Sequence, residues 1–336
     1  MLNRGAIADV FPGLALSIGI AGVSQALEMA EVRLFGGAWV DGLVLAIVLG
    51  TLLHTLWGLP ARYAAGVQFA AKTVLEIAIV LLGASISAAS LAASGIATIG
   101  AVVAVVVASL GLSYGAGRLL GLDDRLATLV SCGNSICGNS AILATAPVIE
   151  AEAEDVAAAI AFTAALGVVA VLVLPGTMRL FGLSEWQYGV VAGLSVYAVP
   201  QVLAATLPVS LVSAQVGTLV KLIRVLMLGP VLLLIGLRRG AGGAVRVPWS
   251  HLVPWFVVGF LVTMAARSCG MVPDKAEPSI RLLSTLLTVV SMAALGLSVN
   301  LRSVLASGGR VLAAGAISIG MLVALSTLAA RLLQHG

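Results

Sequence analysis

The chain contains the segment Ser131-Cys-Gly-Asn-Ser-Ile-Cys-Gly-Asn-Ser-Ala-Ile142, in which the tetrapeptide Cys-Gly-Asn-Ser occurs twice, at 132–135 and 137–140. Apolar runs flank the segment on both sides. Glycine and asparagine are poor helix formers, and serine and asparagine side chains compete for main-chain hydrogen bonds. The segment therefore predicts a membrane helix that is interrupted halfway. Such a break survives at membrane depth only where protein or a cavity surrounds it.

The composition indicates a membrane protein. Of the 336 residues, 60% are hydrophobic and 10% are charged, with a mean hydropathy of +1.14, whereas a soluble protein has about 25% charged residues. Apolar segments of about 20 residues predict the spans of an all-α polytopic protein. Eleven such segments are found, at about 11–28, 39–57, 70–88, 95–117, 126–147, 154–178, 186–206, 212–236, 251–269, 281–299 and 309–332.

Loop charges predict the orientation in the cell (inner) membrane. With eleven crossings, 11 lysines and arginines lie on the N-terminal side, 5 lie on the other side, and 2 lie within the eighth span. The positive-inside rule then places the N-terminus in the cytoplasm and the C-terminus outside. The acidic run Glu150, Glu152, Glu154 and Asp155 is expected on the outer side as a solvated loop. No basic stretch is interleaved with aromatic residues, so no nucleic-acid partner is expected.

A weak internal repeat supports a transporter architecture. The residues Leu82-Gly-Ala-Ser-Ile-Ser87, Ser90 and Ser94-Gly95 match Leu295-Gly-Leu-Ser-Val-Asn300, Ser303 and Ser307-Gly308 at a constant offset of 213. The two copies lie seven spans apart and so cross in opposite directions, as in the inverted repeats of secondary transporters. We expect a single transporter domain over 1–336, with repeats at about 39–178 and 186–332. Chance similarity between two Leu/Ala/Ser-rich segments is the alternative.

The polar residues of the interrupted segment are the first candidates for substrate binding. Their side chains can donate hydrogen bonds, and glycine lets a ligand approach the main chain. These candidates are Asn134, Ser135, Gly138, Asn139 and Ser140. A half-helix that starts at Ser140 would add main-chain amides and a positive helix end. Close helix packing by small residues is the alternative for the glycines.

Two later spans add candidates. Pro200 predicts a second interruption in the middle of the seventh span, and the neighbouring Gln201 can donate and accept hydrogen bonds. Lys221 and Arg224 lie three residues apart in the eighth span and share a helix face. Charged groups within spans usually face an interior or a pathway, so these two could neutralise an anion. Snorkelling to an interface, or pairing with Glu76, is the alternative.

Glu76 is the best candidate for a titrating group that couples transport to sodium or to protons. A local ion pair with Lys72, four residues earlier, is the alternative. The three histidines are scattered, and the cysteines at 132, 137 and 269 lack a zinc-binding spacing. We expect no cofactor and no metal site. No P-loop, Rossmann fingerprint or zinc-protease signature is present, so we expect no enzyme.

Several motifs together match a known family. They are Ser135-Ile-Cys-Gly-Asn-Ser-Ala-Ile142 with Ala146-Pro-Val-Ile149, Gly58-Leu-Pro-Ala-Arg62, Lys221-Leu-Ile-Arg-Val225 with Gly229-Pro230, and Leu295-Gly-Leu297. Over nearly its whole length the chain resembles the YeiH-like conserved membrane proteins, whose family name refers to sulfate export. That family distantly resembles the superfamily of sodium–proton antiporters and bile-acid symporters, in which two broken helices cross at the site. The resemblance implies that the spans at 126–147 and 186–206 are those helices.

One segment departs from the family pattern. Many relatives resemble Ser-Ile-His-Asp-x-Ala-Gln-Val, whereas this chain has Ser195-Val-Tyr-Ala-Val-Pro-Gln-Val202. Tyr197 and Ala198 replace the histidine and the aspartate, while Gln201 remains. The resemblance thus makes Tyr197 and Gln201 candidate site residues. It argues against proton coupling through a His–Asp pair in this chain.

The sequence as a whole predicts a secondary transporter, more specifically an exporter, of a small anion such as a sulfur oxyanion or an organosulfonate. Transport would follow alternating access between two helix bundles. The expected partners are the anion and the lipid bilayer, and a homodimer is compatible with the sequence. The rival functions are a cation–proton antiporter or sodium-coupled symporter, which needs a buried carboxylate, and an intramembrane enzyme, whose nucleophile would need an adjacent base.

Overall fold

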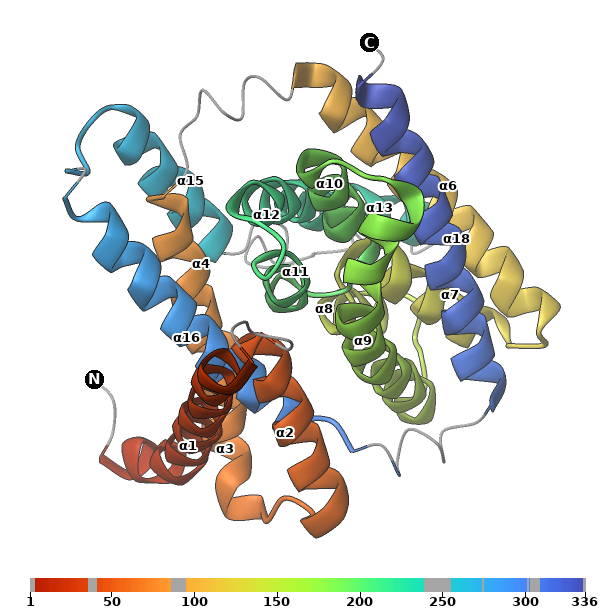
Figure 1. The fold of residues 1–336 in the computed structure, drawn as a ribbon. Coiled ribbons are helices and arrows are strands. Elements are labelled where there is room, and N and C mark those ends of the chain that lie inside the picture. The colour runs from red at the N-terminus through yellow and green to blue at the C-terminus, as the bar shows by residue number, and fades with distance from the viewer. Residues whose placement is uncertain are drawn as a thin grey trace. The chain divides into compact units, whose positions relative to one another are not determined.

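The computed structural model describes residues 4–35, 41–85, 95–238, 255–273, 275–300, 302 and 309–334. Within these residues all regular structure is helical (Figure 1), which confirms the prediction of an all-α polytopic membrane protein. Seven helices are long and apolar enough to cross a membrane, and two shorter apolar helices accompany them. The seven are Asp9–Leu34, Ala61–Gly83, Ala97–Leu119, Ala153–Phe181, Leu211–Arg238, Glu277–Leu297 and Gly309–Leu333, and the shorter two are Gly42–Trp57 and Trp255–Ser268.

The helices group into two compact units. Unit 1 comprises Met1–Ser90 and Phe256–Arg302, and unit 2 comprises Leu91–Trp255 and Ser303–Gly336. The helices of unit 1 are α1 (Arg4–Phe35), α2 (Gly42–Trp57), α3 (Ala61–Phe69), η1 (Ala70–Val74), α4 (Leu75–Gly83), α15 (Trp255–Ser268) and α16 (Glu277–Leu297). This division by packing differs from the predicted division into two sequence repeats, which stays a prediction.

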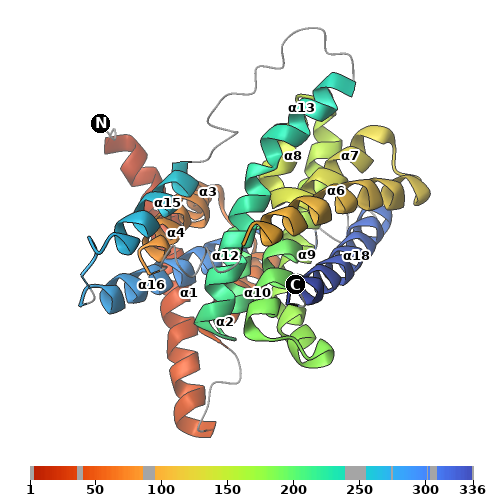
Figure 2. The ribbon, with the colours of Figure 1, turned by 90° about the horizontal axis from the view of Figure 1, so that it is seen from above.

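Unit 2 contains the interrupted segments. Its helices are α6 (Gly95–Leu119), α7 (Asp124–Cys132), η2 (Gly133–Cys137), α8 (Asn139–Thr145), α9 (Ala153–Phe181), α10 (Glu185–Ser195), α11 (Val199–Thr206), α12 (Leu211–Leu226), α13 (Leu228–Arg238) and α18 (Gly309–Gln334). Figure 2 shows α12 continuing into α13. The break between them is explained by Pro230, which lacks the N–H of a regular helical turn.

In unit 1, glycines bring α2 and α16 into main-chain contact. A Cβ atom added at Gly50 would lie 2.4 Å from the Ala293 carbonyl oxygen, and one added at Gly296 would lie 2.3 Å from the Ile47 carbonyl oxygen. Only glycine permits so close an approach at these two positions. This packing of small residues is the usual device for joining membrane helices.

The contact between α4 and α15 repeats this arrangement. A Cβ atom added at Gly83 would lie 2.5 Å from the Phe260 carbonyl oxygen, and the Thr263 hydroxyl donates to the Val80 carbonyl at 2.7 Å. Gly83 and Val80 of α4 correspond to Gly296 and Ala293 of α16. Phe260 and Thr263 of α15 correspond to Ile47 and Gly50 of α2. Each of these four correspondences is an offset of 213 residues (296 − 83 and 260 − 47, for example).

In unit 2, the predicted fifth span is a hairpin. Helix α7 and η2 enter, the chain reverses at Gly138 (φ 65°, ψ −127°), and α8 leads back. The Arg125 guanidinium at the start of the hairpin lies 3.5 Å from the Glu152 carboxylate just after it. Cys132 and Thr145 face each other across the two arms. Both ends of this hairpin therefore lie at the same end of unit 2.

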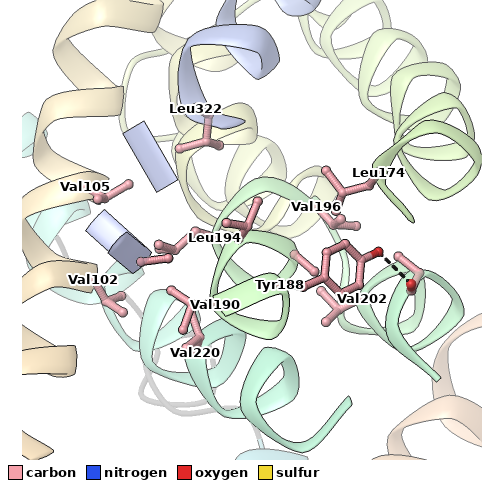
Figure 3. Close-up of a cluster of buried hydrophobic side chains, with 14 of the residues drawn as sticks. Val102, Val105, Leu174, Tyr188, Val190, Leu194, Val196, Val202, Val220 and Leu322 are labelled. Carbon is pink, nitrogen blue, oxygen red and sulfur yellow. Dashed lines mark hydrogen bonds between the residues drawn. The ribbon is translucent and has the colours of Figure 1, made fainter. Parts of the chain in front are cut away.

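The predicted seventh span is a second hairpin. The chain reverses through 196–198 between α10 and α11. The Tyr188 hydroxyl near the start of α10 donates to the Ala205 carbonyl near the end of α11 at 2.7 Å, and Figure 3 shows this bond within the apolar cluster around α10. Pro200 stands at the start of α11. There it helps to restart the helix rather than kink a continuous one.

The two hairpins enter unit 2 from opposite ends. Helix α9 joins the end of the first hairpin to the start of the second, and its 29 residues span about 43 Å. At the far end of α9 the Arg331 guanidinium of α18 donates to the Phe181 carbonyl at 2.7 Å. The tips of the hairpins, in contrast, meet in the middle of the unit. Their contacts form the site described below.

Two sequence expectations were therefore wrong. The segments at 126–147 and 186–206 are interrupted as predicted, but each folds back instead of crossing, because the chain reverses at the break. The acidic run that begins at Glu150 consequently lies at the same end of unit 2 as Arg125 rather than at the opposite end. Span counting also placed Arg179 on the same side as Arg125. Because the first hairpin folds back, Arg179 lies near the far end of α9, away from Arg125.

Candidate functional site

Small residues set the register between α10 and α12. A Cβ atom added at Gly189 would lie 2.8 Å from the Ser213 carbonyl oxygen, and one added at Gly193 would lie 2.5 Å from the Gly217 carbonyl oxygen. The two helices are thus parallel, with residues 24 positions apart side by side. One further turn along α12, this register brings Lys221 to the end of α10, where the second hairpin reverses.

Lys221 contacts both hairpin tips. Its Nζ atom donates to the Ile136 carbonyl at 2.7 Å and to the Val196 carbonyl at 2.8 Å. Ile136 belongs to η2 of the first hairpin, and Val196 follows α10 in the second. The Lys221 side chain is fully buried, so it does not snorkel to an interface. Its ammonium group instead joins the two tips.

Arg224, one turn further along α12, makes the same kind of contact. Its Nε atom donates to the Ser135 carbonyl at 2.7 Å, and its Nη1 atom donates to the Val196 carbonyl at 3.3 Å. Further bonds run from Nη1 to the Leu194 carbonyl and from Nη2 to the Asn134 carbonyl. The side chain is also fully buried. Arg224 thus binds carbonyls of both tips with all three of its nitrogens.

These contacts have a simple electrostatic basis. The last carbonyls of a helix lack intrahelical partners and form the negative end of its dipole. The two cations bind such carbonyls where η2 and α10 end inside the protein. No aspartate or glutamate is buried in the part of the chain that the structure describes. The tips therefore hold two buried basic side chains whose only described hydrogen-bond partners are carbonyl groups.

Three of the predicted site residues present hydrogen-bonding atoms that the described residues leave unused. Asn134 donates through Nδ2 to the Ser113 hydroxyl of α6 at 2.9 Å. Its Oδ1 atom, the Ser135 hydroxyl and the Tyr197 hydroxyl are buried and have no hydrogen-bond partner among the described residues. Tyr197 also packs edge-to-face on Phe162 of α9, with ring centroids 6.2 Å apart. Buried polar atoms are rarely left unpaired, so these three atoms are candidates for binding a ligand.

The reversal at Gly138 presents two further predicted residues. Asn139 and Ser140 begin α8 and are exposed on unit 2, whereas residues 131–138 before them are buried. The Asn139 Oδ1 atom accepts a hydrogen bond from the Thr163 hydroxyl of α9 at 2.5 Å. Thr163 therefore holds the Asn139 amide in place and leaves its Nδ2 donor available.

Gln201 has a role in the hairpin itself. Its Oε1 atom accepts from the Ala198 main-chain N–H at 3.2 Å and so caps α11. Its side chain lies against Gly167 of α9, where a Cβ atom would come within 2.3 Å of it. Glu76, by contrast, is the second residue of α4 in unit 1. The hairpin tips therefore bring together all of the predicted binding residues. Glu76, the predicted coupling residue, is not among them.

Sequence reasoning missed the residues that hold the tips. These are the carbonyls bound by the two cations, the Thr163 hydroxyl that orients Asn139, and the Ser113 hydroxyl that binds Asn134. One available signal was the pair of spacings Gly189-x3-Gly193 and Ser213-x3-Gly217, which is typical of closely packed membrane helices. That pattern predicts the α10–α12 register and hence the position of Lys221.

Fold and site together define a polytopic α-helical membrane protein in which two re-entrant hairpins meet at a buried pair of cations. The profile of the family described as "Conserved hypothetical protein 698" matches residues 12–315. A UPF0324 membrane protein of Brucella melitensis is 54% identical over 321 residues, which cover 95% of this chain and 90% of the relative.

More distant relatives show the same family. A UPF0324 membrane protein of Agrobacterium fabrum is 51% identical over 95% of this chain and 92% of its own length. One of Bacillus cereus is 32% identical over 91% and 89%, respectively. The chain belongs to this family, the YeiH-like UPF0324 membrane proteins. No solved structure matches the chain.

Proposed function

We propose that this protein is a secondary transporter of a small anion, and not an enzyme, and that the substrate binds where the two hairpin tips meet. The observation that carries the proposal is the charge of this site. Lys221 and Arg224 are fully buried there, and no described carboxylate is buried with them. Burial of unpaired charge is costly in a medium of low dielectric constant. An anion at the tips would offset that cost, whereas a bound cation would increase it.

The hydrogen-bonding groups at the tips suit the same class of ligand. The Ser135 and Tyr197 hydroxyls are buried without a described partner, and the Asn139 amide and the Ser140 hydroxyl are exposed beside the Gly138 turn. Hydroxyl and amide groups can all donate to an oxyanion. The YeiH-like proteins that the sequence resembles have a family name that refers to sulfate export, and this resemblance supports a sulfur oxyanion or organosulfonate as substrate and export as the direction.

Alternating access is the proposed mechanism, built on inverted repeats. The 213-residue offset of the sequence repeat recurs in the glycine-mediated contacts α2–α16 and α4–α15. The two hairpins of unit 2 also enter from opposite ends, as inverted repeats require. The division into two compact units supports a mechanism in which each unit moves as a body.

The orientation also belongs to this proposal. Because the hairpins do not cross, Arg179 joins the side opposite the N-terminus, and the lysine and arginine count becomes 10 against 6. The N-terminal side remains the more basic. The positive-inside rule therefore still favours a cytoplasmic N-terminus and, with nine crossings, a C-terminus on the outside.

Flux measurements in proteoliposomes test the function. Purified protein is reconstituted, and uptake of radiolabelled sulfate, sulfite, thiosulfate and methanesulfonate is compared with uptake of sodium. We expect flux of at least one of these anions. Flux of sodium with none of the anions would contradict the proposed class.

Variants at the tips test the site. Asn139→Ala and Ser140→Ala should each abolish anion flux while leaving folded protein in the membrane. The matched control is Thr128→Ala on the first arm of the same hairpin, where the hydroxyl only bonds to the carbonyl of Asp124, and this variant should transport normally. Unchanged flux in Asn139→Ala would refute the site assignment.

A further inference from the structure

The two hairpins of unit 2 resemble each other in sequence as well as in fold. Ser135-Ile136 in the first tip matches Ser195-Val196 in the second tip at an offset of 60 residues. On the return arms, Ala144-Thr-Ala-Pro-Val148 matches Ala205-Thr-Leu-Pro-Val209 at an offset of 61. Positions 60 residues apart are therefore equivalent at the two tips.

The carbonyls that the two basic side chains bind follow this equivalence. Lys221 donates to the carbonyls at 136 and 196, which are 60 residues apart (196 − 136). Arg224 donates to the carbonyls at 134 and 194, which are also 60 residues apart (194 − 134). Each side chain thus lies between matching carbonyls of the two tips, as expected for groups on the axis that relates two inverted repeats.

Only one of the two equivalent helices supplies the guanidinium. Helix α9 follows the first hairpin as α12 follows the second. Leu166 of α9 and Arg224 of α12 are both the fourteenth residue after the N-cap of their helix (166 − 152 and 224 − 210). Leucine has no donor, so a single guanidinium on α12 serves the carbonyls of both tips.

The contacts of Arg224 have the form of a cation site. The guanidinium remains protonated in proteins, and its side chain is fully buried. Four main-chain carbonyls, two from each tip, accept its hydrogen bonds; they are those of Asn134, Ser135, Leu194 and Val196. Secondary transporters coordinate their coupling cations with the main-chain carbonyls of interrupted helices. Here a cation attached to the chain occupies such carbonyls.

We propose that the Arg224 guanidinium is a built-in cation that takes the place of a coupling ion between the hairpin tips. Anion transport then requires no sodium, because the cation stays attached to α12 throughout the cycle. Removal of the side chain leaves a carbonyl-lined site that binds a free guanidinium ion. The statement about transport rests on the proposed function, whereas the statement about guanidinium binding can be tested without it.

Thermal unfolding in detergent tests the binding site. Arg224→Ala should unfold at a lower temperature than the parent, and millimolar guanidinium chloride should raise that temperature by several degrees in a saturable way, since a ligand of the folded state stabilises it. The same concentrations of choline chloride should have no effect. Arg331→Ala is the matched control, because the exposed Arg331 donates to a carbonyl at the surface, that of Phe181. Neither this variant nor the parent should gain stability from guanidinium.

The outcomes against the site are equally clear. An Arg224→Ala protein that folds but gains no stability from guanidinium would overturn the inference, and so would an equal gain in Arg331→Ala. If Arg224→Ala cannot be purified even with guanidinium present, Arg224→Val is titrated in the same way. Valine retains part of the side-chain packing and leaves the carbonyls free, so absence of a guanidinium effect in that variant would also overturn the inference.

Flux in proteoliposomes tests the role in transport. Anion flux of the parent should be unchanged when choline replaces sodium on both sides. Flux should be lost in Arg224→Ala and should recover when guanidinium is added. A parent that requires sodium would contradict the inference, as would an Arg224→Ala protein that binds guanidinium without recovering flux. Guanidinium binding by Arg224→Ala with no flux of any tested anion in the parent would contradict only the proposed function.

Discussion

Replacement of Gly138 by alanine tests the feature on which the site depends, the reversal of the first hairpin. Gly138 has φ 65° and ψ −127°, a main-chain conformation that L-residues rarely adopt. A Cβ atom there would also lie 3.1 Å from the Tyr197 Cβ atom at the tip of the second hairpin. Gly138→Ala should therefore strain the turn and push the two tips apart.

The magnitude follows from these two terms. A non-glycine residue in a sparsely populated main-chain region costs about 1–3 kcal/mol, and overpacking of a tight contact adds about 1–3 kcal/mol. A total of roughly 2–6 kcal/mol corresponds to a fall in melting temperature of roughly 4–24 °C for a body the size of unit 2. Because Tyr197 and the cation contacts lie at the same place, anion flux should be lost as well.

The assay is thermal unfolding of purified protein in detergent, followed by flux in proteoliposomes. Gly182 is the matched control, since it has φ 60° and ψ 41° at the end of α9 and no atom within 4 Å of an added Cβ. Asparagine tolerates that left-handed conformation, so Gly182→Asn should unfold within a few degrees of the parent and transport normally. Parental melting temperature and flux in Gly138→Ala would refute the reversal at this residue.

Three further predictions concern other parts of the chain. Single cysteines that replace Arg125 and Glu152 should react with a membrane-impermeant maleimide from the same side of the membrane, and a cysteine that replaces Arg179 should react from the opposite side. Labelling at 125 and 152 from opposite sides would show that this segment is a crossing helix. Arg224→Met should lower the melting temperature far more than Arg224→Lys, because it leaves buried carbonyls unpaired at about 1–3 kcal/mol each; equal melting temperatures would contradict the role of the guanidinium. Partial burial raises the pKa of the Asp41 carboxyl at the start of α2, so the folded state holds that proton longer than the unfolded state, and stability should fall as pH rises above about 4. Melting curves from pH 4 to 7 should show a weaker decline in Asp41→Asn, and an identical decline would exclude this carboxyl as a cause.

The sequence was sufficient for the helical class, the membrane environment and the place of both interruptions. Glycine, asparagine and serine in an apolar run disfavour helix wherever they occur, so the break at 133–138 could be found locally. Proline likewise indicated the second break, which lies at 196–198, just before Pro200. Lys221 and Arg224 stood out because charge within a span is rare and expensive. These are all properties of single segments.

What the sequence could not provide is the angle between the two arms of each break. A segment of about 20 apolar residues fits a crossing helix and a folded-back hairpin equally well, since hydropathy measures the residues and not their direction. The contact between Arg125 and Glu152 and that between Tyr188 and Ala205 decide the question, and both join residues far apart in sequence. Sidedness inferred from span counting is consequently least secure around interrupted segments.

The same contacts constrain how the site can move. Lys221 and Arg224 each bind carbonyls of both tips, so separation of one hairpin from the other would break several hydrogen bonds to charged groups. Each such bond is worth about 1.5–3 kcal/mol, so opening one hairpin alone would cost several kilocalories per mole. Movement of both hairpins together with α12 breaks none of these bonds. For the proposed transporter, these contacts therefore favour displacement of unit 2 as a body over gating by either hairpin alone.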